Sequence, residues 1–228
     1  MTDKKVSVIG GGLDPRFLEA DGDRGLKRND ARFTILSVGR LIERKGCGMV
    51  LRSLARIRHA LSDWRYVIIG GGPYEADLTR MIAEFGLQEH VSILNQVDDR
   101  SLVGWYGVSD LFVMVSREIP ERGEVEGLGL VYMEAGAARV PVIAGRSGGV
   151  ADAVEDGLNG ILVDPRSVDE LSEGILRLYR DADLRKRLGE NGRGLAEKEW
   201  LWEKVAVRIL GAVLESSTQA KKGPGGKE

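Results

Sequence analysis

Cysteine, histidine and long apolar runs are scarce in this chain of 228 residues. The single cysteine, Cys47, excludes an internal disulfide and is typical of a reducing compartment. The two histidines, His59 and His90, are isolated and have no metal-ligand spacing around them. No run of about 18 apolar residues could cross a bilayer, and the amino terminus does not resemble a signal peptide. With 33 basic and 35 acidic residues, no net field draws the chain to nucleic acid or membrane. We therefore expect a cytoplasmic protein without metal, nucleic acid or a membrane span.

Short apolar and β-branched runs alternate with helical patterns along the chain. The predicted strands lie near residues 33–38, 65–69, 91–95, 110–115, 140–144 and 160–163. The runs VIIG, LFVMV and PVIAG are apolar throughout, which is typical of strands covered on both faces. The predicted fold class is therefore α/β, a Rossmann-like doubly wound parallel sheet.

The last predicted helix has apolar residues on one side, which we interpret as a core-facing stripe. They are Trp202, Val205, Ala206, Ile209, Leu210 and Val213. After this helix, the final segment KKGPGGKE lacks apolar side chains. We therefore predict a disordered tail over residues 216–228.

Two glutamates frame a glycine-containing segment, EGLGLVYMEA. Gly127 and Gly129 allow the backbone to approach a ligand, and a helix predicted from Leu130 would point unpaired amides at a phosphate. Glu134, about one turn inside this helix, could accept hydrogen bonds from ribose hydroxyls. Glu126, in the loop before it, could do so for a sugar. The alternative is that both glutamates are solvated surface charges.

A second candidate segment, SVGRLIERKG, follows the predicted strand 33–38. Arg40 and Lys45 thus lie in a loop at the carboxyl end of a strand, where open α/β sheets bind ligands. Both cations suit phosphate oxygens. Glu43 and Arg44 share the loop, so the alternative is a solvated charge cluster.

Two glycine clusters, VSVIGGG and VIIGGGPYEADL, invite a dinucleotide-binding interpretation. In the first, Pro15 stands where the fingerprint needs its third glycine, and in the second Glu75 replaces it. A nicotinamide or flavin cofactor is therefore not expected.

The chain resembles the carboxyl-terminal, donor-binding domain of a family-4 retaining glycosyltransferase of the GT-B fold, in the glycosyl transferases group 1. The resemblance runs from about Val8 to about Leu214. It is carried, in order, by GLDPRF, ILSVGRLIERKG, YVIIGGGPYEADL, VSILNQVDD, SDLFVMVS, EGLGLVYMEAGAARVPVIA, GGVADAVEDGLNGILVDP and WLWEKVA. It implies an interdomain linker remnant over residues 1–30 and a nucleotide-sugar-binding domain over 31–215, one half of a GT-B enzyme.

The resemblance also implies residue roles. As catalytic residues, Arg40 and Lys45 would bind the donor's diphosphate, and Glu126 would bind the hydroxyls of its sugar. The donor-binding residues would be Glu134 on the ribose, Gly127, Gly129, Leu130 and Val131 at the phosphates, and the main chain of Gln96 and Val97 at the base.

The implied reaction transfers a sugar, with retention and without a metal, from a UDP- or GDP-linked donor. The acceptor would be bound by an N-terminal domain absent from this chain, so we expect the isolated domain to be inactive. Two alternatives remain open: a non-catalytic nucleotide- or phosphate-binding module, and half of a sugar-nucleotide epimerase or a phosphorylase.

Overall fold

A computed structural model describes residues 11–20 and 31–221 of the chain. The rest of the predicted linker, including VSVIG, and the end of the predicted tail lie outside the described residues.

Six parallel strands form one sheet in the order β3-β2-β1-β4-β5-β6. The strands are β1 (Phe33–Val38), β2 (Trp64–Ile69), β3 (Val91–Leu94), β4 (Leu111–Met114), β5 (Val142–Gly145) and β6 (Gly160–Val163). All the predicted strands are confirmed, with the largest shift at β5, which was predicted over 140–144. The chain builds outward from β1 to β3 and then crosses back to β4 on the other side of β1. The loops after β1 and β4 therefore diverge, which opens a crevice at the carboxyl edge.

Seven α-helices lie within the described residues, four of them between strands and three after the last strand. They are α1 (Cys47–Ile57), α2 (Glu75–Glu84), α3 (Asp99–Val108), α4 (Leu130–Ala137), α5 (Val168–Arg180), α6 (Ala182–Leu195) and α7 (Trp202–Lys221). Short helical turns are η1 (Pro15–Glu19), η2 (Glu43–Lys45), η3 (Arg58–Ala60), η4 (Pro120–Arg122), η5 (Gly148–Asp152) and η6 (Ala196–Trp200). Side-chain caps fix several helix starts: Asp98 accepts from the Ser101 amide, Ser167 from Glu170, and Asp181 from Leu184.

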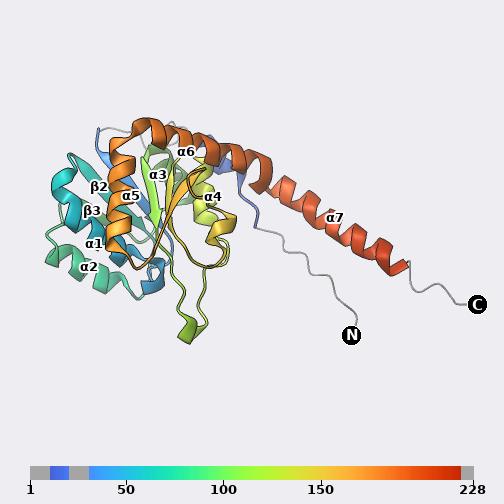
Figure 1. Cartoon of the computed structure of the whole chain (residues 1–228), viewed down its shortest axis with the longest axis horizontal. Coiled ribbons are helices and arrows are strands. Elements are labelled where there is room, and N and C mark those ends of the chain that lie inside the picture. Colours follow the sequence, from blue (N-terminus) through green and yellow to red (C-terminus); the bar gives the residue numbers. More distant parts are fainter. Residues whose placement is uncertain (1–10, 21–30, 222–228) are drawn as a thin grey trace, which may run out of the picture.

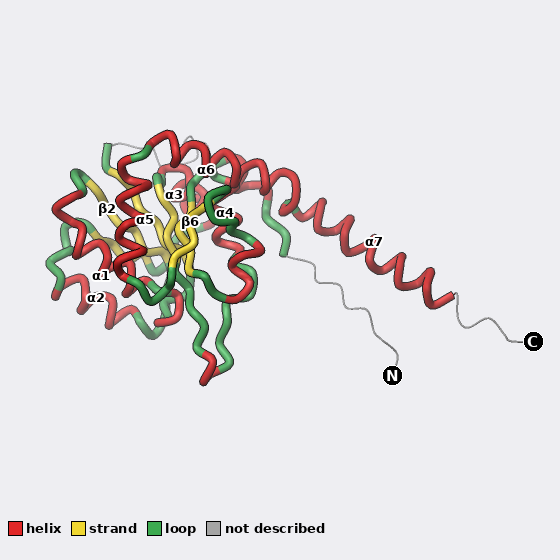
Figure 2. The backbone as a smooth tube through the Cα atoms, viewed as in Figure 1, coloured by secondary structure: helices red, strands yellow, loops and turns green. Residues whose placement is uncertain are grey.

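Helices cover both faces of the sheet, as Figures 1 and 2 show. On one face, Leu54 of α1 and Ile175 of α5 pack on strand residues such as Ile35. On the other, Tyr106 of α3 and Tyr132 of α4 pack around Phe112 of β4. Each strand is therefore buried on both sides, which explains its continuous apolar sequence.

The core on the α3 and α4 side of the sheet, called the second core here, includes residues of the amino-terminal segment 11–20. Leu13 and Phe17 are buried, and the Phe17 ring meets that of Tyr106 edge to face at 5.5 Å. The Leu13 amide donates to the Trp200 carbonyl at 2.6 Å, and the Trp202 amide donates to the Leu13 carbonyl at 3.3 Å. Part of the predicted linker is thus paired with the chain just before α7.

The predicted core stripe on the last helix is wrong. Val205 is buried, but Trp202, Leu210 and Val213 are 54%, 59% and 58% exposed. Figure 1 shows α7, in red, extending away from the domain. A helical period reveals an apolar face but does not reveal what covers it. The helix also continues to Lys221, so residues 216–221 of the predicted disordered tail are helical, and the rest of that tail lies outside the described residues.

Two glycines of α6 allow a direct test of how this helix packs. A Cβ on Gly189 would lie 2.1 Å from the Arg139 carbonyl oxygen, whereas a Cβ on Gly194 would meet nothing within 4 Å. Gly189→Ala should lower the free energy of unfolding by roughly 1–3 kcal/mol through overpacking. Gly194→Ala should raise it by roughly 0.5–1 kcal/mol through helix propensity. Urea unfolding measures both, and equal effects would contradict this packing.

Candidate functional site

The loop after β1 is held by the loop after β2. The Gly39 amide donates to the Ile69 carbonyl and the Leu41 amide to the Gly71 carbonyl, both at 2.9 Å. A Cβ on Gly70 would lie 2.0 Å from the Gly39 carbonyl oxygen. Only glycine permits this approach, and Gly70 has a φ of +134° that other residues rarely adopt. The glycine cluster after β2 therefore packs the loop that carries Arg40 and Lys45.

Glu126 is the centre of a polar cluster that joins the loops after β1 and β4. Its Oε2 accepts from Lys45 Nζ at 2.6 Å, Ser116 Oγ at 2.8 Å and Arg44 Nη1 at 3.2 Å. The side chains are largely enclosed, with 8% of Glu126, 15% of Lys45 and 13% of Arg44 exposed. Lys45 and Glu126 therefore lie on the same edge of the sheet, as their proposed joint role requires.

Opposing effects act on the Glu126 carboxylate. Burial raises its pKa, whereas the ammonium of Lys45, the Ser116 hydroxyl and the guanidinium of Arg44 lower it. The net pKa of Glu126 is below its ordinary value. This carboxylate is therefore held as an anion by its partners.

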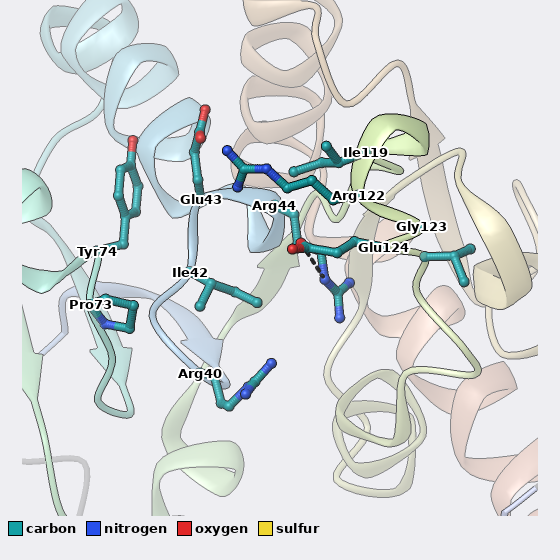
Figure 3. Close-up of a pocket in the computed structure, with 11 residues that line it drawn as sticks. Arg40, Ile42, Glu43, Arg44, Pro73, Tyr74, Ile119, Arg122, Gly123 and Glu124 are labelled. Atoms are coloured by element: carbon teal, nitrogen blue, oxygen red, sulfur yellow. Dashed lines mark ion pairs between the residues drawn. The ribbon is translucent and has the colours of Figure 1, made fainter.

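Arg40 is exposed beside this cluster and has no ion-pair partner among the described residues. It lines a pocket of about 570 Å³ together with Ile42, Arg44, Tyr74, Arg122 and Val125. Figure 3 shows this pocket between the loop after β1 and the loop that leads to α4. Figure 1 shows the latter loop projecting from the domain. An open, partly basic pocket at this edge has room for an anionic ligand.

Glu134 occupies a different environment, on α4. Its Oε2 accepts from the Tyr106 hydroxyl at 2.7 Å. Burial raises the pKa of Glu134 above its ordinary value, although Tyr106 and the charge of Arg16 partly offset the shift and Asp14 adds to it. None of these partners belongs to the Glu126 cluster.

The remaining predicted positions lie along the same edge. α4 begins at Leu130, directly after Gly129 in a left-handed conformation with φ of 73°. Gly127 and Leu130 are exposed and Val131 is partly buried. Gln96 and Val97 follow β3; Gln96 is exposed, and Val97 packs against the second core.

The structure thus brings Lys45 into contact with Glu126 and places Arg40 beside them. Glu134 is separate from this cluster and contacts Tyr106 instead. Sequence reasoning missed Ser116 and Tyr106, and it treated Arg44 only as part of a surface charge cluster. Ser116 had a usable signal, because a polar residue directly after a buried strand lies at the binding edge. Tyr106 had none, because a tyrosine on an apolar helix face predicts core packing.

No group of three or more potential metal-ligating residues gathers in the part of the chain that the structure describes. No helix among the same residues is long and apolar enough to cross a membrane.

A comparison with known protein families identifies the family of this chain. Residues 21–195 match the model of the family described as glycosyl transferases group 1. The chain belongs to this family. The resemblance inferred from the sequence motifs and the predicted fold class are both confirmed.

Individual relatives and solved structures are also similar to this chain. The chain is 35% identical, over 78% of its length and 46% of the relative, to the GDP-mannose-dependent alpha-(1-6)-phosphatidylinositol monomannoside mannosyltransferase of Mycobacterium tuberculosis. It matches the solved C-terminal domain of a glycosyl transferase group 1 family protein from Francisella tularensis with a TM-score of 0.70 and 24% identity, covering 84% of this chain and 100% of that one. An Anabaena protein solved with UDP and glucose matches with a TM-score of 0.79 and 22% identity, over 92% of this chain and 57% of that one. The chain spans about half the length of the curated relatives it matches.

The lowered pKa of Glu126 predicts a stability that depends on pH. At neutral pH, Glu126→Gln should reduce the free energy of unfolding by roughly 1–3 kcal/mol, because Lys45 and Arg44 lose an anionic partner. The stabilising contribution of Glu126 exists above its ordinary pKa and disappears as the pH falls through the lowered folded-state pKa. Urea unfolding of both proteins across this range should show the difference shrinking in acid, and a constant difference would contradict the assignment.

Glu134 should behave in the opposite way. Its raised folded-state pKa means that its contribution is complete below the ordinary pKa and is lost as the pH rises through the raised value. Glu134→Gln should therefore become more stable relative to the parent chain as the pH increases from about 4 to about 8. Urea unfolding of both proteins over this pH range measures the difference in stability. If Glu134→Gln instead loses stability relative to the parent chain, burial does not dominate the pKa of Glu134.

Proposed function

We propose that this chain is the donor-binding half of a retaining, metal-independent glycosyltransferase that uses a nucleoside diphosphate sugar. The observation that carries the proposal is the contact of Lys45 with Glu126 at the point where the sheet order reverses. There, cations for a diphosphate and a carboxylate for sugar hydroxyls lie side by side. Retention is proposed from the resemblance to family-4 enzymes.

The proposed reaction breaks the bond between the sugar's anomeric carbon and the diphosphate oxygen, and the bonding electrons leave with the diphosphate. An acceptor hydroxyl oxygen forms the new bond to that carbon, and its proton passes to the released diphosphate. Arg40 and Lys45 would stabilise the charge that grows there, together with the amides at the start of α4. At an effective dielectric constant near 20, one cation about 4 Å from a phosphate oxygen contributes on the order of 4 kcal/mol before desolvation. These two cations supply charge that a divalent metal would otherwise provide.

Glu134 is proposed to bind the ribose, and the main chain of Gln96 and Val97 to bind the base. We propose GDP-mannose as the first donor to test, because mycobacterial relatives matched over 78% of this chain are GDP-mannose-dependent mannosyltransferases. UDP-linked sugars remain the second choice. A cytoplasmic location is proposed from the single buried cysteine, Cys47.

The acceptor would be bound by a second domain of the complete protein. Two observations support this: the chain covers about half of its curated relatives, and α7 exposes Trp202, Ile209, Leu210 and Val213 to solvent. An apolar surface of this kind marks a contact with another part of an assembly. We propose that the second domain covers it.

Calorimetric titration of the chain with GDP, UDP and ADP tests the proposal. Lys45→Ala should weaken binding of the preferred diphosphate by at least about tenfold, with a reduced dependence on salt, because it removes a phosphate cation. Lys186→Ala, at an exposed position of α6, is the control and should bind as the parent chain does. Absence of binding by the parent chain to all three nucleotides would refute the proposal.

Glu134→Ala should weaken binding of the nucleoside and of its diphosphate by similar factors, because both contain the ribose. It should leave binding of inorganic pyrophosphate unchanged. Calorimetry with guanosine, GDP and pyrophosphate separates the cases, and an equal loss for pyrophosphate would remove the ribose assignment.

A further inference from the structure

Arg44 has no role in the site proposed so far, yet its guanidinium contacts Glu126, the central residue of the polar cluster. Its Nη1 lies 3.2 Å from Glu126 Oε2, and its Nε lies 3.7 Å from Glu124 Oε2. Only 13% of the Arg44 side chain is exposed. Figure 3 marks the ion pair between Arg44 and Glu124 with a dashed line. Arg44 therefore ties the loop after β1 to two carboxylates of the loop before α4.

The partners of Glu126 bind only one of its two carboxylate oxygens. Lys45, Ser116 and Arg44 all donate to the same oxygen, Oε2, and no described residue donates to Oε1. The second oxygen is the one available to a ligand hydroxyl. The direction of Oε1 is set by the residues that bind Oε2, because the carboxylate group is planar and turns as one unit.

Once a donor is bound, Lys45 has two possible anionic partners, Glu126 and the diphosphate. In the structure it is within 2.6 Å of Glu126, and in the proposed function it binds the diphosphate. An ammonium on a flexible stem can turn from one to the other. The diphosphate also brings negative charge near Glu126, which disfavours the ionised carboxylate. Arg44, anchored on Glu124 and unable to lose its proton, stays in place.

We propose that Arg44 is a positioning residue that keeps the Glu126 carboxylate ionised and directed at the donor's sugar when Lys45 turns to the diphosphate. The proposal rests on the proposed function and deepens it. Arg44 thereby determines recognition of the sugar portion of the donor, whereas Lys45 determines recognition of the nucleotide portion.

The test compares two ligands that differ only in the sugar, GDP and GDP-mannose, by calorimetry on the whole chain. UDP and UDP-glucose form a second pair, and the pair whose nucleotide the parent chain binds is used. Arg44→Gln should weaken binding of the sugar nucleotide about tenfold and leave binding of the free diphosphate within about twofold. Arg44→Lys, which retains a cation, should recover most of the lost affinity.

A matched control is present in the same pair of loops. Arg117 pairs with Glu43 and donates from its backbone amide to the Arg44 carbonyl, but its side chain has no contact with Glu126. Arg117→Gln should therefore leave the ratio of the two affinities unchanged. If it lowers the ratio as much as Arg44→Gln does, the effect comes from loosened loops and the inference is overturned.

A second variant covers the case in which Arg44→Gln does not fold. Glu124→Gln removes the other anchor of Arg44 and should weaken only the sugar nucleotide, by a smaller factor than the loss of Arg44. Equal losses for GDP and GDP-mannose in either variant would overturn the inference, because Arg44 would then act on the diphosphate. Binding of GDP but not GDP-mannose by the parent chain would also overturn it, while absence of all binding refutes the proposed function itself.

Discussion

The parallel pairing of β1 with β4 is the constraint on which the candidate site depends. These strands are neighbours in the sheet although they are far apart in the chain, with Ile35 opposite Leu111 and Leu36 opposite Phe112. Because both strands run the same way, the loops that follow them emerge at one edge. Lys45 and Arg44 come from the first loop, and Ser116 and Glu126 come from the second. Without this pairing, no short-range feature of the chain would bring the four side chains together.

The pKa values of two glutamates in one short motif are shifted in opposite directions for physical reasons. Glu126 is enclosed with two cations and a hydroxyl, so its negative charge is favoured despite burial. Glu134 is enclosed with a tyrosine hydroxyl and a more distant arginine, so burial prevails. The two glutamates are eight residues apart in one motif, but they have different hydrogen-bond partners. In the proposed function the two carboxylates would meet distinct parts of one ligand, with the sugar hydroxyls at Glu126 and the ribose at Glu134.

The amino-terminal segment and the start of α7 leave the domain at the same place. Leu13 pairs with the backbone around Leu201, so the chain entering the domain and the chain leaving it run side by side. Beyond this point α7 buries Val205 but exposes the apolar side chains that follow. The two chain segments therefore share one exit from the domain, and the exposed helix face begins there.

The sequence by itself determined the sheet, its parallel sense and the helices on both faces, because burial on both sides of a strand leaves a continuous apolar run that can be read residue by residue. It also determined that Arg40 and Lys45 lie in the loop after a strand, where such sheets bind ligands, and that Glu126 lies in the loop before a helix. Only the tertiary structure decided that Arg44 and Ser116 share an oxygen of Glu126, that Glu134 pairs with Tyr106, and that the apolar side of α7 is uncovered. Each of these depends on contacts between segments distant in the chain. Periodicity and local motifs record a residue's own backbone and its neighbours along the sequence, but not the group that folding places against it.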